Sequence, residues 1–177
     1  MTTEPEVVVL RLGHRPGRDE RTTTHVGLTA RALGADRVVL PSAAGSAVTT
    51  INDVTRQFGG PFVVETTDDP LSFLSAWDGV IAHLTMYGEP IQDVVPVVRA
   101  SNSSGLLIVV GAEKVPFAVY ERADWNIAVT NQPHSEIAAL GVFLDRFFEG
   151  VELDQQWRDA NKRVVPEPAG KTVESID

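Results

Sequence analysis

Arginine supplies most of the positive charge of this chain, and much of it lies in one segment near the N-terminus. Lysine occurs at only three positions, residues 114, 162 and 171. Five arginines fall between residues 11 and 31: Arg11, Arg15, Arg18, Arg21 and Arg31. A guanidinium group binds phosphate through two parallel hydrogen bonds, which an ammonium group cannot reproduce. The segment is therefore a candidate anion-binding site, although a solvated loop on an ordinary acidic protein would have the same composition.

Three further segments combine polar and small residues, and each follows an apolar run. They are 84–88 (LTMYG), 111–115 (GAEKV) and 130–136 (TNQPHSE). The carboxyl ends of parallel strands meet at one edge of a sheet, where open α/β sheets bind their ligands. Gly111 has no Cβ and would let a ligand approach the backbone. Gly88, Gly111 and Asn131 are also common in simple turns, which would give them no role in binding. We expect the three segments to form one ligand site.

The elements that would position these segments alternate between strands and helices. Apolar and β-branched runs predict strands at 7–10, 37–40, 62–65, 80–84, 106–110 and 125–129. Helical spacing predicts helices at 25–33, 46–58, 70–76, 91–99, 117–122 and about 133–148, the first capped by Thr24 and the last with Pro133 in its first turn. This alternation predicts an α/β fold, with a mostly parallel sheet of about six strands and helices on both faces.

Composition limits the domain organisation and the environment. A chain of 177 residues, 43% of them hydrophobic, predicts one domain, which we place at 1–150, and a tail or short hairpin at 151–177. No apolar run approaches the roughly 20 residues of a membrane span, and the N-terminus lacks the features of a signal peptide. We therefore expect a cytoplasmic protein with no membrane partner. A net charge of −9 with so few lysines suggests a surface adapted to high salt.

Several common active-site signatures are absent from the sequence. There is no dinucleotide-binding G-x-G-x-x-G after the first strand, no phosphate-binding P-loop motif and no G-x-S-x-G motif. The chain has no cysteine, and His14, His25, His83 and His134 lack metal-ligand spacing, so no metal site is expected. His83 lies in an apolar strand and should be a hydrogen-bonded core histidine.

Four long strings carry a resemblance to a known family. Residues 10–36, 83–88 (HLTMYG), 109–116 (VVGAEKVP) and 131–140 (NQPHSEIAAL) closely resemble the archaeal tRNA 2′-O-methyltransferases that act on the T-loop cytidine at tRNA position 56. That family belongs to the SPOUT class of methyltransferases. The resemblance implies S-adenosylmethionine as cofactor, a C-terminal trefoil knot, a homodimer, and the T-loop of tRNA as partner. A different RNA target, or a non-catalytic module that binds RNA or an adenosine ligand, remains an alternative.

The resemblance also implies roles for individual residues. Cofactor contacts are expected at Leu84, Gly111, Ala112, Glu113, Lys114, Val115, Val129, Thr130, Asn131, Gln132, Pro133, His134, Ser135 and Glu136. SPOUT ribose methyltransferases resemble one another in using an arginine beside the reacting hydroxyl, but Leu28 stands at the usual position here. We therefore expect the arginine-rich segment to supply it, with Arg21 the first choice, then Arg15 and Arg18. Since arginine keeps its proton, its role would be electrostatic stabilisation. His134 would either orient the ribose or simply cap the last helix.

Overall fold

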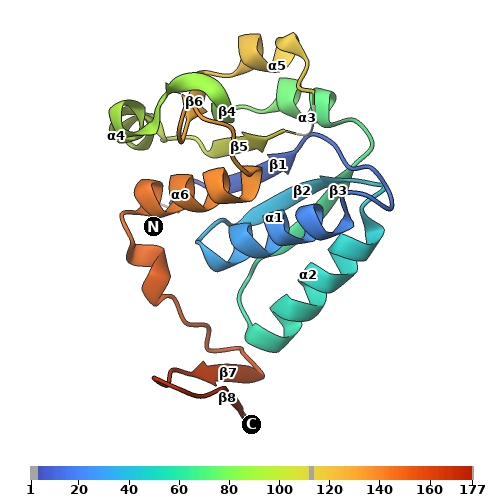
Figure 1. The fold of residues 1–177 in the computed structure, drawn as a ribbon, viewed down its shortest axis with the longest axis vertical. Coiled ribbons are helices and arrows are strands. Elements are labelled where there is room, and N and C mark those ends of the chain that lie inside the picture. The colour runs from blue at the N-terminus through green and yellow to red at the C-terminus, as the bar shows by residue number, and fades with distance from the viewer. Residues whose placement is uncertain (1–3, 112–113, 177) are drawn as a thin grey trace.

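Six parallel strands form the centre of the molecule. The computed structural model describes residues 4–111 and 114–176 (Figure 1). The strands are β1 (Val7–Arg11), β2 (Arg37–Pro41), β3 (Val63–Thr67), β4 (Val80–Pro90), β5 (Leu106–Val110) and β6 (Trp125–Ala128). Their order across the sheet is β3-β2-β1-β5-β4-β6, and all five pairings are parallel. The predicted six-stranded parallel sheet is confirmed.

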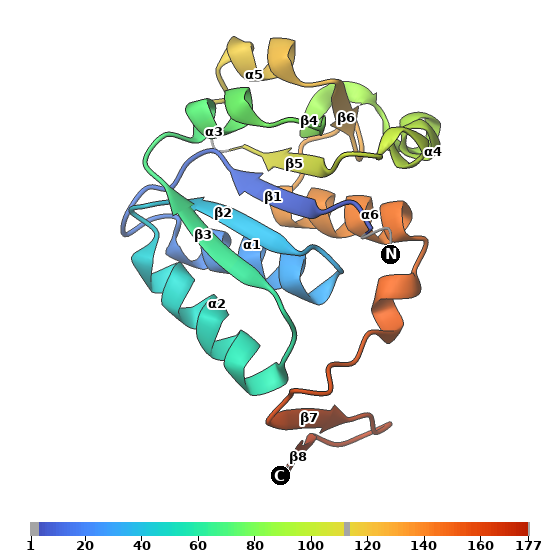
Figure 2. The same cartoon turned by 180° about the vertical axis from the view of Figure 1, so that it is seen from behind.

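Helices cover both faces of this sheet, but unequally. The longer helices α1 (Glu20–Ala32), α2 (Gly45–Phe58) and α6 (Glu136–Phe148) lie on one face, in front of the sheet in Figure 1 and behind it in Figure 2. Helix α4 (Ile91–Ser101) contributes to the same hydrophobic core. The short helices α3 (Pro70–Ala76) and α5 (Phe117–Arg122) pack against the other face. The four larger helices therefore enclose the main core.

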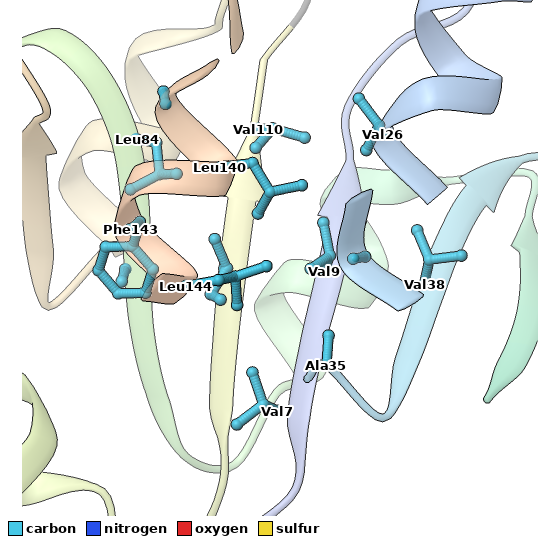
Figure 3. Packing of buried hydrophobic residues seen from close by; sticks show 14 of the residues in the cluster. Val7, Val9, Val26, Ala35, Val38, Leu84, Val110, Leu140, Phe143 and Leu144 are labelled. Atoms are coloured by element: carbon cyan, nitrogen blue, oxygen red, sulfur yellow. The ribbon is translucent and has the colours of Figure 1, made fainter. Parts of the chain in front are cut away.

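Side-chain alternation along the central strands assigns residues to the two cores. Val7 and Val9 of β1 point into the larger core, together with Leu140 and Leu144 of α6 (Figure 3). Val8 and Leu10 point into the smaller core on the other face. Every residue of β1 and β5 is buried, as expected for central strands of a parallel sheet. This rigid centre fixes the positions of the segments that follow the strands at their carboxyl ends.

Two helices begin elsewhere than the sequence predicted. Helix α1 starts at Glu20, not His25, and Thr24 is not its cap; the Thr24 hydroxyl instead donates to the carbonyl oxygen of Glu20. Arg21 therefore lies in the first turn of a helix and not in a loop. Helix α6 starts at Glu136, so Pro133 and His134 precede it and do not lie in its first turn.

The end of β4 also differs from the prediction. The strand continues to Pro90, through the segment that was expected to form a polar turn after residue 84. Its pairing with β6 is interrupted there, because Leu84 and Glu89 both stand opposite Ile127. Residues 85–88 thus bulge from the ladder while the chain keeps its extended direction.

The C-terminal part lies apart from the main sheet. A short 3-10 helix, η1 (Val151–Asp154), is followed by an antiparallel pair, β7 (Lys162–Val165) and β8 (Thr172–Ser175). Figure 1 shows this hairpin, in red, beyond the end of α2. Asn161 donates from its side chain to the carbonyl oxygen of Arg56, and Lys162 donates to the side chain of Gln57. In the described ranges, no helix is long and apolar enough to cross a membrane.

Candidate functional site

A cavity of about 560 Å³ opens at the carboxyl edge of the sheet, beside the ends of β4 and β5. Its described lining comes from the three segments and from three residues outside them, one each in β4, α5 and α6: His83, Leu84, Thr85, Met86, Tyr87, Gly111, Lys114, Val115, Tyr120, Pro133, His134, Glu136 and Ala139. The three segments predicted to converge at one edge therefore do so. The volume falls within the range of about 300–1,000 Å³ typical of small-ligand sites.

The predicted cofactor residues divide into two groups by their relation to this cavity. Seven line it: Leu84, Gly111, Lys114, Val115, Pro133, His134 and Glu136. Five others lie nearby in the chain without forming its described lining: Val129, Thr130, Asn131, Gln132 and Ser135. Ala112 and Glu113 lie outside the described residues, as does the expected Glu113–Lys114 ion pair. The contact of each residue with a cofactor stays a prediction.

Gly111 is needed by the chain itself. A Cβ at this position would lie 2.5 Å from Cγ2 of Val115, so any larger residue would force the Val115 side chain to shift. The Val115 side chain occupies space that a Cβ on Gly111 would need. The glycine thus shapes the apolar part of the cavity, whether or not a ligand approaches its backbone.

Asn131 joins two walls of the cavity without lining it. Its side-chain amide donates to the carbonyl oxygens of Met86 (2.7 Å) and Gly88 (3.1 Å). The segment after β6 is thereby held against the bulged end of β4. These bonds add to the pairing of β4 with β6, which is interrupted at this point. Asn131 is therefore a brace between two segments that both contribute to the cavity.

Replacing Asn131 by alanine should weaken ligand binding in the cavity by about tenfold, because two donated hydrogen bonds are lost. Isothermal titration with S-adenosylhomocysteine would measure the change. Asn131→Asp should bind the ligand at least as weakly as Asn131→Ala, since a carboxylate cannot donate to the two carbonyl oxygens. The exposed Gln92 of α4 has no side-chain hydrogen bond among the described residues and lies outside the described lining of the cavity. Gln92→Ala is therefore the control and should bind normally. Unchanged affinity in Asn131→Ala would show that the brace does not shape the cavity.

His83 is a buried member of the cavity wall, as predicted for a hydrogen-bonded core histidine. Nδ1 lies 2.9 Å from Oδ1 of Asn126, and the Asn126 amide donates to the carbonyl oxygen of Tyr120. Burial lowers the pKa of His83 and outweighs the opposing effect of its bond to Asn126. The ring is therefore neutral, with Nδ1–H donating to Asn126. The Tyr120 hydroxyl continues the network to Thr85 at 3.0 Å.

The start of α6 places polar groups differently from the prediction for His134. Ser135 is the N-cap, and its hydroxyl oxygen accepts from the backbone N–H of Ile137 at 3.2 Å. His134 is exposed, and its Nδ1 lies 2.6 Å from the carbonyl oxygen of Gln132. Capping by His134 is therefore wrong. A role for its ring in orienting a sugar stays a prediction.

The arginine-rich segment is ordered by its own ion pairs. Arg15 donates to Asp19 from both Nε and Nη2, each at 3.0 Å, and from its backbone N–H. These bonds hold the pKa of Asp19 at about 2, below its usual range, with smaller contributions from the charges of Arg15 and Arg11. Arg15 is thus already engaged within the chain. The local pairing explains why α1 starts earlier than expected.

The side chains of Arg18 and Arg21, unlike that of Arg15, are not bonded within the described part of the chain. Both are exposed, and the described part of the chain gives neither guanidinium group a hydrogen-bond or ion-pair partner. None of the three arginines proposed for chemistry, residues 15, 18 and 21, belongs to the described lining of the cavity. Two of the three, Arg18 and Arg21, are therefore available to an external anion, but outside the described lining of the cavity.

Arg11 is the functional candidate that sequence reasoning missed. It was counted with the arginine-rich segment, yet it ends β1 with only 2% of its surface exposed. Its Nη1 lies 2.6 Å from Oε1 of Glu136, a cavity residue 125 positions later in the chain. The signal in the sequence was that Arg11 is the next residue after Val7 and Val9 in the alternation of the strand, so its side chain faces the same core. That pattern places the side chain under α6 and not in a solvated loop.

Comparison with known proteins gives concordant matches. Residues 58–174 match the family described as tRNA ribose 2′-O-methyltransferase, aTrm56. A relative from Natronomonas pharaonis, named tRNA (cytidine(56)-2′-O)-methyltransferase, is 62% identical over 178 residues and covers 100% of this chain and 99% of the relative. Relatives of the same name from Haloarcula marismortui and Thermococcus kodakarensis are 60% and 49% identical, covering 100% and 97% of this chain and 99% and 98% of their own lengths.

Solved structures share the fold at low identity. A putative RNA methyltransferase of the TrmH family from Porphyromonas gingivalis has a TM-score of 0.60 at 10% identity, covering 83% of this chain and 61% of that one. The SpoU methyltransferase AviRb from Streptomyces viridochromogenes, solved with AdoMet, has a TM-score of 0.56 at 12% identity, covering 82% and 58%. This chain thus spans about three fifths of the length of those two proteins. The likeness concerns the fold alone.

Proposed function

The chain belongs to the aTrm56 family of tRNA ribose 2′-O-methyltransferases, and on this premise we propose that it methylates the ribose 2′-hydroxyl of cytidine 56 in the T-loop of tRNA. The methyl donor is S-adenosylmethionine. The observation that carries the proposal is full-length identity of 62% to a relative with this activity in its name. The cavity at the carboxyl edge of the sheet supports it, because the expected cofactor segments meet there.

The residues around the cavity suit this methyl donor. Leu84, Val115 and Ala139 offer apolar surface for an adenine ring, while Glu136 and backbone groups at the strand ends offer hydrogen-bond partners. When bound, S-adenosylmethionine supplies an electrophilic methyl group. The chain must then supply what the acceptor lacks, because a ribose hydroxyl is a poor nucleophile. An arginine beside it would stabilise the developing oxyanion, and Arg21 is our choice for this role.

Methyl transfer to defined RNAs tests the proposal. The purified protein should transfer labelled methyl groups from S-adenosylmethionine to an unmodified tRNA transcript. The same tRNA with 2′-deoxycytidine at position 56 should accept none, since it differs only in the reacting hydroxyl. Transfer to the deoxy substrate, or to ribosomal RNA instead, would overturn the assignment of the nucleotide. Binding of S-adenosylhomocysteine without transfer to any RNA would favour the non-catalytic module.

We also infer a homodimer with a C-terminal trefoil knot, working in the cytoplasm, where it would meet tRNA. Membership of the family supports the knot and the dimer. Arg18 and Arg21 are exposed and lie outside the described lining of the cavity. In a dimer, the arginine-rich segment of one subunit would reach the cavity of the other, and Arg21 could then act on a hydroxyl bound there.

The acidic surface leads to a prediction about salt. With a net charge of −9, the folded chain repels itself, and added salt shortens the range of that repulsion from about 10 Å at 0.1 M to about 3 Å at 1 M. Its melting temperature should therefore rise as KCl increases over this range. Differential scanning calorimetry would measure the rise.

A variant with fewer acidic side chains is the control for this effect. Asp78, Asp93, Glu121 and Asp154 are exposed and have no salt bridge within the described residues. Changing all four to the corresponding amides should raise the melting temperature in dilute buffer and shrink the gain from salt. If wild type and variant respond equally to KCl, the response comes from general salt effects on burial and not from the surface charge.

A further inference from the structure

Arg11 is an unusual residue to find at the centre of this sheet. It ends β1, one of the two central strands, and it is among the largest fully buried side chains of the described chain. It continues the alternation of Val7 and Val9 and therefore lies on the face that α6 covers. Burying a charge costs several kcal/mol unless it is well paired, and an apolar side chain would usually serve stability better. The position therefore calls for an explanation other than core packing.

The partner of Arg11 connects it to the cavity. Glu136 is the first residue of α6, its side chain is 34% exposed, and it belongs to the cavity lining. Nη1 of Arg11 lies 2.6 Å from its Oε1, which is a short, charge-assisted hydrogen bond. Arg11 thus reaches the carboxylate from the buried side while that carboxylate also borders the cavity. A side chain held by an ion pair loses the rotational freedom that an exposed glutamate normally keeps.

A second carboxylate, that of Asp19, feels the charge of Arg11. The pKa of Asp19 is lowered mainly by its hydrogen bonds from Arg15, and the charge of Arg11 contributes to the same effect. Arg11 thus makes an ion pair with a carboxylate of the cavity wall and has a smaller electrostatic effect on one in the arginine-rich segment. Nε of Arg11 is buried and has no hydrogen-bond partner among the described residues, so the guanidinium depends on few contacts for its placement.

We propose that Arg11 is a positioning residue for methyl-donor binding, which holds the Glu136 carboxylate in the wall of the cavity in the orientation that receives the donor. The inference rests on the proposed function, since it takes the cavity as the donor site. Arg11 itself lies behind the wall and acts through Glu136. Its removal would leave that carboxylate free to turn away, and the ligand would then have to order it again on binding.

Binding of S-adenosylhomocysteine to four variants tests the proposal. Arg11→Met removes the charge and keeps the length, and Glu136→Gln removes the partner charge. Each should weaken binding by about tenfold, measured by isothermal titration below the melting temperature of the variant. The double variant should bind no more weakly than the weaker single variant, because both changes break one interaction. Arg11→Lys restores the charge without the planar fork and should recover part of the affinity.

A buried arginine can matter for folding alone, so a matched control is needed. Arg37 also pairs with carboxylates, Glu6 and Glu65. It is the first residue of β2, so it lies at the amino ends of the strands, away from the cavity at their carboxyl ends. Arg37→Met should lower stability and leave affinity for S-adenosylhomocysteine unchanged. If Arg11→Met proves too unstable to study, Arg11→Lys against wild type gives the same comparison.

The outcomes separate this inference from the proposed function. Normal affinity in folded Arg11→Met or Arg11→Lys, or additive losses in the double variant, would overturn the positioning role while leaving the enzyme assignment intact. A wild type that binds S-adenosylhomocysteine but methylates no RNA would overturn the enzyme assignment, and the role of Arg11 in binding would still be measured. A wild type that does not bind S-adenosylhomocysteine would overturn both.

Discussion

Replacing Arg21 by alanine should lower the rate of methyl transfer to tRNA by about 10²–10³-fold, which is the usual effect of removing one group that stabilises a developing oxyanion. Affinity for S-adenosylhomocysteine should not change, because Arg21 is exposed on the first turn of α1 and lies outside the described lining of the cavity. Single-turnover transfer at saturating tRNA would measure the first quantity, and isothermal titration the second. This separation of rate from cofactor affinity is the signature of a group that acts on the acceptor.

The neighbouring arginines are the controls for this prediction. Arg18 is exposed as Arg21 is, so Arg18→Ala tests a role limited to phosphate binding, which should weaken tRNA affinity and reduce its salt dependence without a comparable loss of rate. Arg15 is engaged with Asp19, and Arg15→Ala should disturb the start of α1 instead. Unchanged turnover in Arg21→Ala would remove Arg21 from the reaction and pass the role to Arg18 or Arg15.

If the protein is the homodimer proposed above, mixed dimers would show which subunit's cavity Arg21 serves. Gly111→Val should disable the cavity, because even a Cβ at that position would press on Val115. If Arg21 acts on the cavity of the other subunit, mixing this variant with Arg21→Ala should restore activity, since one of the two sites in a mixed dimer is then intact. If Arg21 acts within its own subunit, both sites stay damaged and no activity returns.

The sheet was predictable from sequence because each strand carries its own signal. The run 106–110 is apolar throughout, and it forms a central, fully buried strand. The start of α1 was not predictable in this way, since it depends on side-chain bonds within the preceding segment. Glu20 accepts from the backbone N–H of Gly17 and Asp19 pairs with Arg15, and these contacts add the turn that propensity alone placed in a loop.

Sequence predicted which segments form the site, because strand direction determines where they meet. It did not predict the side-chain contacts within the site, because these depend on tertiary packing. Parallel strands bring their carboxyl ends to one edge, so the meeting of 84–88, 111–115 and 130–136 followed from the alternation of strands and helices. The contact between Arg11 and Glu136 joins residues 125 positions apart, and no local pattern encodes it. The bonds of Asn131 to Met86 and Gly88 are of the same kind. Sequence located the site, and tertiary contacts determine how its walls are held.

Gly88 illustrates this limit and leads to a large expected effect. From sequence it was an ordinary turn glycine, but it lies in the extended end of β4, directly against the backbone of β6. A Cβ at residue 88 would overlap the carbonyl group of Asn126 and lie 2.5 Å from the amide nitrogen of Ile127. These are backbone atoms of a paired strand, so they cannot move aside as the end of a flexible side chain can.

Gly88→Ala should therefore lower the free energy of unfolding by about 3 kcal/mol or more, at the upper end of the effects of overpacking. It should also weaken binding of S-adenosylhomocysteine, because Met86 and Tyr87 line the cavity and the carbonyl oxygen of Gly88 accepts from Asn131. Urea denaturation would measure the first effect and isothermal titration the second.

Gly45→Ala is the matched control for this change. A Cβ on Gly45, the first residue of α2, would meet no heavy atom within 4 Å. Alanine also restricts the unfolded chain more than glycine does, so this variant should be neutral or slightly more stable. If Gly88→Ala unfolded at the same urea concentration as Gly45→Ala and bound S-adenosylhomocysteine normally, the bulged end of β4 would have room to move away from β6. The close packing of these two segments would then not be what holds the cavity wall in place.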